Sequence, residues 1–195
     1  MSTTNPIRER ILSHGLGIAS QQGLTALTMG TLAREMDLPR AGLSQHFADR
    51  ETLQLGVLEQ ATALFLHDVV DATVSVPAGE ARLKALFSRW IAWSRAPILK
   101  GGCPFVHASR QASELAEPVR TRLKEVLDGW SQIVTDAIAD AKRNRQFRAD
   151  LDAEQMVFEL YGLYLSHHFF HWYMKDKAVE ARTMKAFDRL LAASR

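Results

Sequence analysis

A short polar stretch, residues 40–46, carries the side chains whose types and spacing suggest a chemistry. Arg40 has the planar guanidinium that can donate two hydrogen bonds to a guanine edge, and Gln45 has the amide that can pair with adenine. Ser44 and His46 can reach phosphate oxygens. The chemistry indicated is therefore hydrogen bonding to a nucleic-acid duplex, and not the making or breaking of covalent bonds.

The apolar residues around this stretch predict the helices that position it. Leu43 and Phe47 stand four residues apart, which puts both on one helix face and turns the polar residues to the opposite face. A preceding short helix, with Thr28 as its N-cap, and a turn at Asp37 complete a helix-turn-helix. The residues expected to contact DNA are Thr28, Arg40, Ala41, Gly42, Ser44, Gln45, His46 and Arg50. Two short core helices with a solvated polar face remain the alternative.

The rest of the chain has helical apolar spacing, and no stretch shows the period-two alternation of a strand. We therefore expect an all-α fold. Further helices are expected over residues 7–23, 50–72, 80–96, 104–113, 118–143, 153–174 and 179–193. We predict a helix-turn-helix DNA-binding domain over residues 1–50 and a ligand-binding and dimerisation domain over residues 51–195, linked by the long helix 50–72.

The composition excludes several classes of protein. Hydrophobic residues make up 47% and charged residues 24%, which excludes a disordered or fibrous chain. The single cysteine, Cys103, excludes an intrachain disulfide and favours the reducing cytoplasm. The richest apolar stretch, residues 161–174, contains three histidines and is too short to cross a bilayer. We expect a cytoplasmic protein with no membrane partner.

Catalytic signatures are missing from the sequence. It contains neither the phosphate-cradling GxxxxGK[ST] loop nor a nucleophile elbow, and Gly15 and Gly17 lie inside an expected helix without a preceding strand. We therefore expect no enzyme activity and no cofactor. A helical enzyme, and a helical small-molecule-binding protein that does not bind DNA, are the alternatives in other function classes.

Residues 8–58 resemble the N-terminal domain of the TetR family of transcriptional regulators. The resemblance rests on a helix that ends at Gly23, followed by the string LTALTMGTLAREMDLPRAGLSQHFADRETL. The family frame is present as Leu32-Ala33, Leu38, Gly42-Leu43, His46-Phe47, Arg50 and Leu53. Two positions depart from it: Asp37 replaces a frequent glycine of the turn, and Ser44 replaces a tyrosine that usually touches phosphate.

The resemblance implies a ligand-responsive transcriptional regulator. In its simplest form this is a repressor that binds a palindromic operator in double-stranded DNA as a homodimer and is released by a small-molecule effector. It also implies an inducer site among the body helices, for which we predict the lining residues Phe87, Trp90, Trp93, Phe105, Trp130 and Tyr161. Ordinary core packing is the alternative for each of these aromatic residues.

The expected helix 153–174 is apolar on two sides, so it needs two partners. One is its own core, and for the other we expect a second subunit, with the last two helices of each chain paired as the resemblance implies. A larger core within a monomer is the alternative. The predicted interface residues are Leu160, Tyr164, His167, His171, Phe187 and Leu190. His167 and His171 have a spacing that can share a zinc ion, but no cysteine pair or acidic cluster completes a site, so we expect no metal.

Cys103 directly precedes Pro104, the first residue of an expected helix, and would therefore occupy an N-cap. Backbone N–H groups and the helix dipole favour a thiolate there, so sensing of electrophiles or oxidants through Cys103 is an alternative mode of regulation. A small structural residue in a turn is the other interpretation of this cysteine.

Charge alone does not point to nucleic acid. The 195-residue chain has a formal net charge of +2, and residues 1–60 hold five arginines against six carboxylates. DNA affinity would have to come from the placement of a few arginines, helix N-termini and neutral donors. We therefore expect a shallow dependence of DNA affinity on salt.

Overall fold

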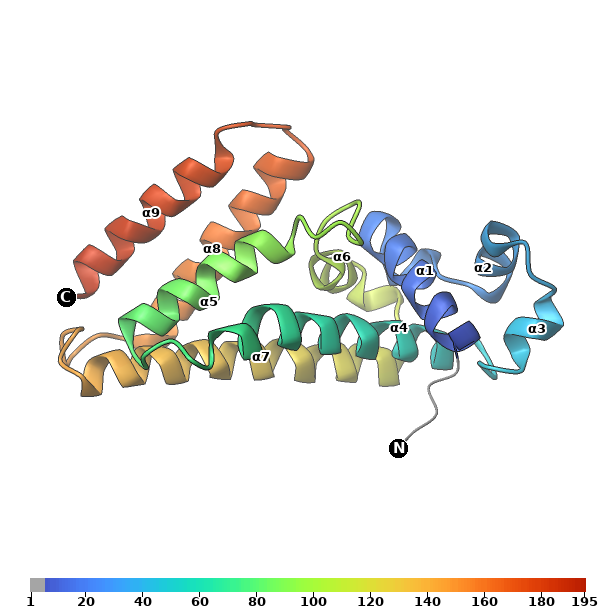
Figure 1. The fold of residues 1–195 in the computed structure, drawn as a ribbon, viewed down its shortest axis with the longest axis horizontal. Coiled ribbons are helices and arrows are strands. Elements are labelled where there is room, and N and C mark those ends of the chain that lie inside the picture. Colours follow the sequence, from blue (N-terminus) through green and yellow to red (C-terminus); the bar gives the residue numbers. More distant parts are fainter. Residues whose placement is uncertain (1–5) are drawn as a thin grey trace. The chain divides into compact units, whose positions relative to one another are not determined.

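The computed structural model describes residues 6–195, and the regular elements within this range are all helical (Figure 1). The predicted all-α fold is therefore confirmed for these residues. The helices are α1 (Pro6–Gln22), α2 (Met29–Met36), α3 (Arg40–Ser44), α4 (Arg50–Phe65), α5 (Glu80–Trp93), α6 (Pro104–Arg110), α7 (Glu117–Arg143), α8 (Ala153–Trp172) and α9 (Val179–Ser194). Short segments between them are η1 (Leu24–Ala26), η2 (Leu66–Val70), η3 (Asp71–Thr73) and η4 (Ala112–Glu114).

The chain forms two compact units. Unit 1 comprises the described residues up to Leu64 together with Arg95–Val126, and unit 2 comprises Phe65–Ser94 and Leu127–Arg195. Helices α4 and α7 each contribute residues to both units. The division into functional domains at residue 50 stays a prediction, and its first five residues lie outside the described range.

The helix-turn-helix of unit 1 has the N-cap and the turn residue that the sequence predicts. The Thr31 N–H donates to Thr28 Oγ1 at 3.0 Å, which makes Thr28 the N-cap of α2. Asp37 adopts a left-handed conformation with φ of 51° and turns the chain from α2 toward α3. At the start of α4 the Thr52 N–H donates to Asp49 Oδ1 at 2.8 Å.

Helix α6 and the loop before it pack against the C-terminal end of α1 within unit 1. A Cβ on Gly101 would lie 2.3 Å from the Ser20 carbonyl oxygen, so only glycine lets the loop approach the α1 backbone this closely. The Gln111 side-chain amide donates to the Gln22 carbonyl at 3.1 Å. A displacement of the segment 101–111 would therefore displace α1 with it.

An ion pair joins α4 and α7 in unit 1. Arg122 Nε lies 2.5 Å from Glu59 Oε1, and Arg122 Nη2 lies 3.1 Å from Glu59 Oε2, so the contact is bidentate. The hydrogen bonds from Arg122 lower the pKa of the Glu59 carboxyl. The two helices run side by side through this contact (Figure 1).

The winding of the expected helix 50–72 changes after Phe65. It is α-helical to Phe65 and continues through the π-helical turn η2 and the 3-10 turn η3 to Thr73. Arg89 Nη1 from α5 donates to the Asp68 carbonyl at 3.1 Å inside the altered turn. Apolar periodicity predicts the helical segment but not this change of winding, which is held by a contact from a distant helix.

An ionic contact in unit 2 joins the start of α5 to Arg195, the residue directly after α9. Glu80, the first residue of α5, accepts from Arg195 Nη2 at 2.5 Å and from Lys84 Nζ at 2.8 Å. The hydrogen bonds from Arg195, followed by those from Lys84, lower the pKa of the Glu80 carboxyl from 4.5 to about 2. None of the helices over residues 6–195 combines the length and apolar character needed to cross a membrane.

Candidate nucleic-acid interface

Helix α3 is fixed to the core of unit 1 by two anchors. Leu43 is fully buried, and Phe47, one turn further on, is almost completely buried. The Arg8 guanidinium lies 5.2 Å above the centre of the Phe47 ring, which adds a cation–π contact from α1. The predicted anchors are confirmed, and the other side chains of α3 are left on the side away from the core.

The residues predicted to contact DNA lie on this outer side or at its edge. Five of them are exposed: Arg40, Ala41, Ser44, Gln45 and Arg50. The other three are half-buried: Thr28, Gly42 and His46. A Cβ built on Gly42 would meet no heavy atom within 4 Å, so the α3 backbone is open to close approach at this position. Their contact with DNA stays a prediction that this arrangement permits.

Three of these eight residues also have a structural role. The Thr28 hydroxyl oxygen caps α2, and the Ser44 hydroxyl donates to the Arg40 carbonyl at 3.1 Å. Arg50 donates from Nη2 to the Thr25 carbonyl at 2.5 Å and from Nε to the Leu27 carbonyl at 3.3 Å. Sequence reasoning assigned Arg50 to phosphate binding and missed these bonds to the chain that precedes α2.

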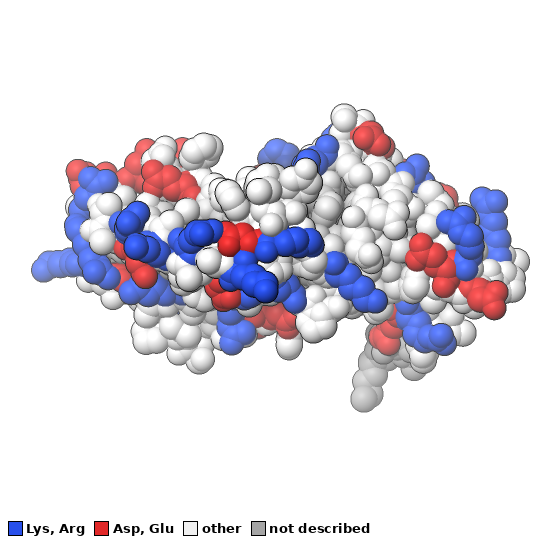
Figure 2. All heavy atoms as spheres, turned by 90° about the horizontal axis from the view of Figure 1, so that it is seen from above, with Lys and Arg blue, Asp and Glu red and all other residues white. Residues whose placement is uncertain are grey.

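The surface around α2 and α3 is not uniformly basic. Figure 2 shows basic and acidic side chains next to one another at the end that carries these helices. This mixture follows from the balance of arginines and carboxylates in residues 1–60. Attraction to DNA must therefore depend on which cations border α3 and not on an extended positive field.

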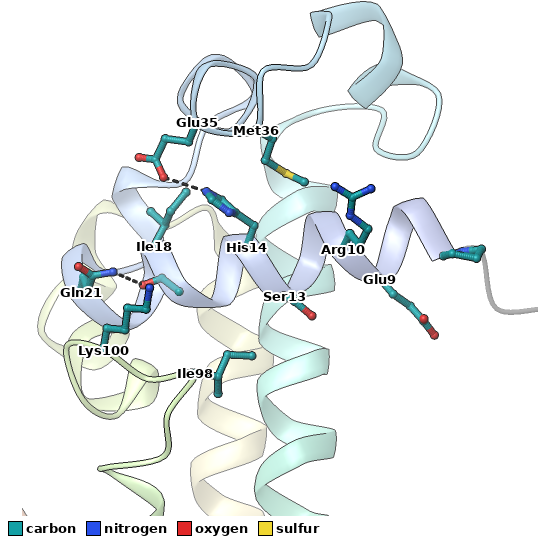
Figure 3. A pocket seen from close by; sticks show the side chains of 12 residues that line it. Glu9, Arg10, Ser13, His14, Ile18, Gln21, Glu35, Met36, Ile98 and Lys100 are labelled. Atoms are coloured by element: carbon teal, nitrogen blue, oxygen red, sulfur yellow. Dashed lines mark hydrogen bonds and ion pairs between the residues drawn. The ribbon is translucent and has the colours of Figure 1, made fainter.

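A groove of about 800 Å³ runs along α1 between α2 and the loop at residues 98–100 (Figure 3). His14 Nε2 and Glu35 Oε2 are 3.0 Å apart and link α1 to α2 beside this groove. Apolar side chains that line it are Ile18, Met36 and Ile98. The first helix of the helix-turn-helix thus has a polar contact with α1 that the sequence did not predict.

The aromatic residues predicted to line an effector site are only partly brought together. Trp90, Trp93, Trp130 and Tyr161 share one cluster in unit 2. Phe65 of α4 also belongs to this cluster, because its ring centroid lies 5.6 Å from that of Trp93 and 5.0 Å from that of Trp130. Sequence reasoning missed Phe65, although its place on the apolar face of helix 50–72 could have indicated it.

The other two predicted lining residues have different surroundings. Phe87 stacks on Phe187 with 4.2 Å between ring centroids and meets Trp90 edge-on at 6.3 Å, so it borders the cluster. Phe105 is buried in α6 and belongs to unit 1. An effector site among these residues stays a prediction, and Phe65 is added to the residues that it would involve.

Cys103 occupies the N-cap of α6, and Pro104 is the first residue of that helix, as the sequence predicts. The cysteine side chain is only 2% exposed. A reactive sensor thiol needs access to solvent as well as a lowered pKa. Burial therefore favours the structural interpretation of this residue.

The six residues predicted at the dimer interface do not form an exposed surface. Leu160, Tyr164, His167 and Phe187 are almost completely buried within the chain itself, and His171 and Leu190 are half-buried. His167 Nδ1 lies 3.2 Å from Thr183 Oγ1, and its ring stacks on His171. These side chains join α8 to its own core, so a second chain cannot contact most of them.

The exposed apolar face of α8 lies on a different stripe. Phe158 is 73% exposed, and Leu165 and Phe169 are each about half exposed. Gly162 lies between them in the helix, and a Cβ there would meet nothing within 4 Å. Periodicity placed two apolar sides on this helix, but it could not show which side packs against the chain's own core.

A protein-family model matches the C-terminal part of the chain. Residues 79–187 match the family model described as "Tetracyclin repressor-like, C-terminal domain". These residues run from the start of α5 to the last helix α9. The match therefore covers more than half of the chain, and it lies outside the helix-turn-helix.

The chain is also similar to individual proteins, at low sequence identity. The "HTH-type transcriptional repressor NemR" of Escherichia coli strain K12 is 21% identical over 167 residues, which cover 84% of this chain and 82% of that protein. A TetR-family transcriptional regulator from Cytophaga hutchinsonii superposes with a TM-score of 0.81 at 16% identity, over 100% of this chain and 98% of the other. One from Streptomyces coelicolor gives 0.80 at 21% identity, over 96% and 89%.

Proposed function

The chain belongs to the TetR family of transcriptional regulators, and on this premise we propose that it is a repressor that binds a palindromic operator as a homodimer. A small-molecule effector that binds in unit 2 releases the repressor from DNA. Double-stranded DNA, the effector and a second copy of the chain are thus its three partners.

The observation that carries the DNA-binding proposal is the orientation of α3. Leu43 within α3 and Phe47 after it are buried, while Arg40 at the start of α3 and Gln45 at its C-cap are exposed. A helix held in this way offers base-reading side chains to a major groove without loss of packing. The acidic neighbours disfavour unspecific binding, so the affinity depends on sequence-specific contacts.

Retardation of DNA from the protein's own promoter tests this proposal. We expect specific retardation by the unmodified protein, a loss of at least tenfold in affinity for Arg40→Ala, and no such loss for Arg120→Ala. Arg120 is an exposed arginine of α7, so its replacement removes the same charge elsewhere on the chain. If DNA is not retarded with or without added cell extract, the chain is a helical ligand-binding protein of another kind.

The dimer proposal rests on the exposed apolar stripe of α8, formed by Phe158, Gly162, Leu165 and Phe169. An exposed stripe with this spacing on a long helix suits packing against a second helix, and Gly162 provides room for close approach. We expect Phe158→Asp combined with Phe169→Asp to yield monomers in analytical ultracentrifugation. Val74→Asp should leave the dimer intact, because Val74 is 65% exposed but lies outside this stripe.

The effector proposal rests on the aromatic cluster around Phe65 and on the packing of α6 against α1. An effector that favours one arrangement of unit 2 shifts the dimer toward states whose two α3 helices no longer match the operator half-sites. The close contact of Gly101 with Ser20 supports a coupling of α6 to the DNA-binding helices. An effector found by screening is expected to abolish retardation of operator DNA at saturating concentration.

A further inference from the structure

Two buried indole groups in the aromatic cluster lack a hydrogen-bond partner among the described residues. The Trp93 and Trp130 side chains are 3% and 5% exposed, and no described residue accepts from the Nε1 atom of either one. An indole N–H can donate but cannot accept. Most buried donors in proteins are paired, because an unpaired donor destabilises the folded chain. Two such groups in one cluster therefore mark a place where an outside acceptor would be favoured.

Both indoles are neighbours of the same phenylalanine. The Trp93 and Trp130 rings meet the Phe65 ring edge-to-face at 5.6 and 5.0 Å. Trp130 is also 5.0 Å from Trp90. By contrast, Trp172 Nε1 donates to the Ser94 carbonyl at 3.1 Å, so an unpaired buried indole is not a general property of the tryptophans in this chain.

The surroundings of the two donors restrict the charge of a ligand. The rings in contact with one another here belong to phenylalanine, tryptophan and tyrosine, and the Tyr161 hydroxyl is already within 3.2 Å of Ser131 Oγ. These neutral rings provide no counter-ion for a carboxylate, whose burial without one is costly. A cation would lie against the positive edges of the indoles, and one face of Trp90 is already covered by Tyr164 at 4.0 Å.

We propose that the effector is an uncharged, ring-sized apolar molecule that carries a carbonyl-type oxygen, such as a ketone, lactone or ester. Its oxygen accepts from the Trp93 and Trp130 indoles, and its apolar body lies against the outside of this group of rings. One carbonyl oxygen has two lone pairs and can serve both donors. The proposal rests on the proposed function, because it assigns a ligand class to the effector site.

A matched pair of probes tests the assignment. 1-Indanone and indane have nearly the same shape and differ in the carbonyl oxygen, and phenyltrimethylammonium represents the cationic class. In the ¹⁵N-labelled protein, 1-indanone should shift the indole N–H resonances of two of the four tryptophans, Trp93 and Trp130, whereas indane should shift neither downfield. Calorimetry should give at least tenfold tighter binding of 1-indanone than of indane.

Variants that keep an aromatic ring but remove the donor sharpen the test. Trp93→Phe and Trp130→Phe should each weaken 1-indanone binding at least fivefold and leave indane binding unchanged, while Trp172→Phe should change neither. The resonance shifts in the unmodified protein provide the result even if a variant fails to fold.

Three outcomes would overturn the assignment: equal binding of the two probes, tighter binding of phenyltrimethylammonium, or unshifted indole resonances, which would indicate a buried water only. Retardation of operator DNA by the same preparation separates this failure from that of the proposed function. If DNA is bound but the carbonyl preference is absent, only the ligand class is wrong.

Discussion

Arg50 Nη2 lies 2.5 Å from the carbonyl oxygen of Thr25, so the first residue of α4 is hydrogen-bonded to the turn that precedes α2. The same side chain reaches the Leu27 carbonyl through Nε. A guanidinium can serve both carbonyls because its donors project in a fixed planar fork. This arginine therefore helps to hold together the segments on either side of the helix-turn-helix, whatever it contributes to DNA binding.

Replacement of Arg50 is expected to destabilise the protein. Arg50→Lys keeps the charge but cannot form both bonds, so it should lower the free energy of unfolding by about 1–2 kcal/mol in urea titrations. Arg40→Lys is the matched control, because Arg40 is an exposed arginine at the start of a neighbouring helix. Equal stability of the two variants would show that Arg50 has no structural role.

Gly42→Ala should separate folding from DNA binding. No heavy atom lies within 4 Å of a Cβ at this position, and alanine favours a helix by about 0.5–1 kcal/mol over glycine. We therefore expect an unchanged or slightly raised melting temperature together with weaker retardation of operator DNA. Retained DNA affinity would mean that α3 does not approach DNA at Gly42.

Gly15→Ala provides the contrast inside the core. A Cβ on Gly15 would lie 2.8 Å from Val57 Cγ2, so overpacking between α1 and α4 should lower the free energy of unfolding by about 1–3 kcal/mol and lower the melting temperature with it. A melting temperature equal to that of the unmodified protein would contradict the close approach of these helices.

The Glu80 carboxylate predicts a pH-dependent part of the stability. Its pKa is lowered to about 2 in the folded chain from 4.5, so its pairing with Arg195 and Lys84 stabilises the fold above about pH 4.5. This contribution falls as the pH drops from 4.5 toward 2. Glu80→Gln should thus be about 1 kcal/mol less stable at pH 7, with a difference that shrinks in acid.

Chemical unfolding at a series of pH values measures this difference. Glu114→Gln, which changes an exposed glutamate of η4, should differ little from the unmodified protein across the same range. A Glu80→Gln difference that stays constant between pH 7 and pH 3 would show that the ionised carboxylate is not what stabilises the end of unit 2.

Cys103 should react slowly with thiol reagents in the native protein. Its side chain is 2% exposed, so modification requires a local opening of unit 1. We expect the rate with Ellman's reagent to be about 100-fold below that of the same protein in urea, which serves as the reference. Similar rates in both conditions would restore thiol sensing as the mode of regulation.

DNA affinity should depend weakly on salt. The arginines of residues 1–60 are few, and Arg50 is already bonded to backbone carbonyls. A plot of log affinity against log salt should have a slope shallower than about −7, the value for eight phosphate contacts per dimer. A steeper slope would reveal phosphate contacts from other parts of the chain.

The sequence predicted much of the local structure of the helix-turn-helix formed by α2 and α3. Thr28, Asp37 and Asp49 act through their own side chains or backbone within a few residues, so their roles follow from local patterns. Leu43 and Phe47 were identified as anchors, and both are buried, but α3 ends at Ser44 and Phe47 lies beyond the helix that was expected to carry it. These features need no knowledge of distant parts of the chain.

The features that the sequence did not predict depend on residues far apart in the chain. The bond from Arg50 to Thr25 and the link from His14 to Glu35 join separate elements. Helix α8 is apolar on several sides, so periodicity could not distinguish the core-facing Tyr164 from the exposed Phe158. Trp90, Trp93 and Trp130 were predicted together, but their contact with Phe65 of α4 was missed because it joins distant parts of the chain.

The outer side of α3 has a consequence for how such a protein diverges. Leu43 is the only residue of this five-residue helix that is buried, so the exposed positions Arg40, Ala41 and Ser44 carry little of the packing. If α3 binds the operator as proposed, substitutions at these positions after gene duplication would change the operator that one copy binds while both copies still fold. New specificities are thus reachable in single mutational steps that avoid an unstable intermediate.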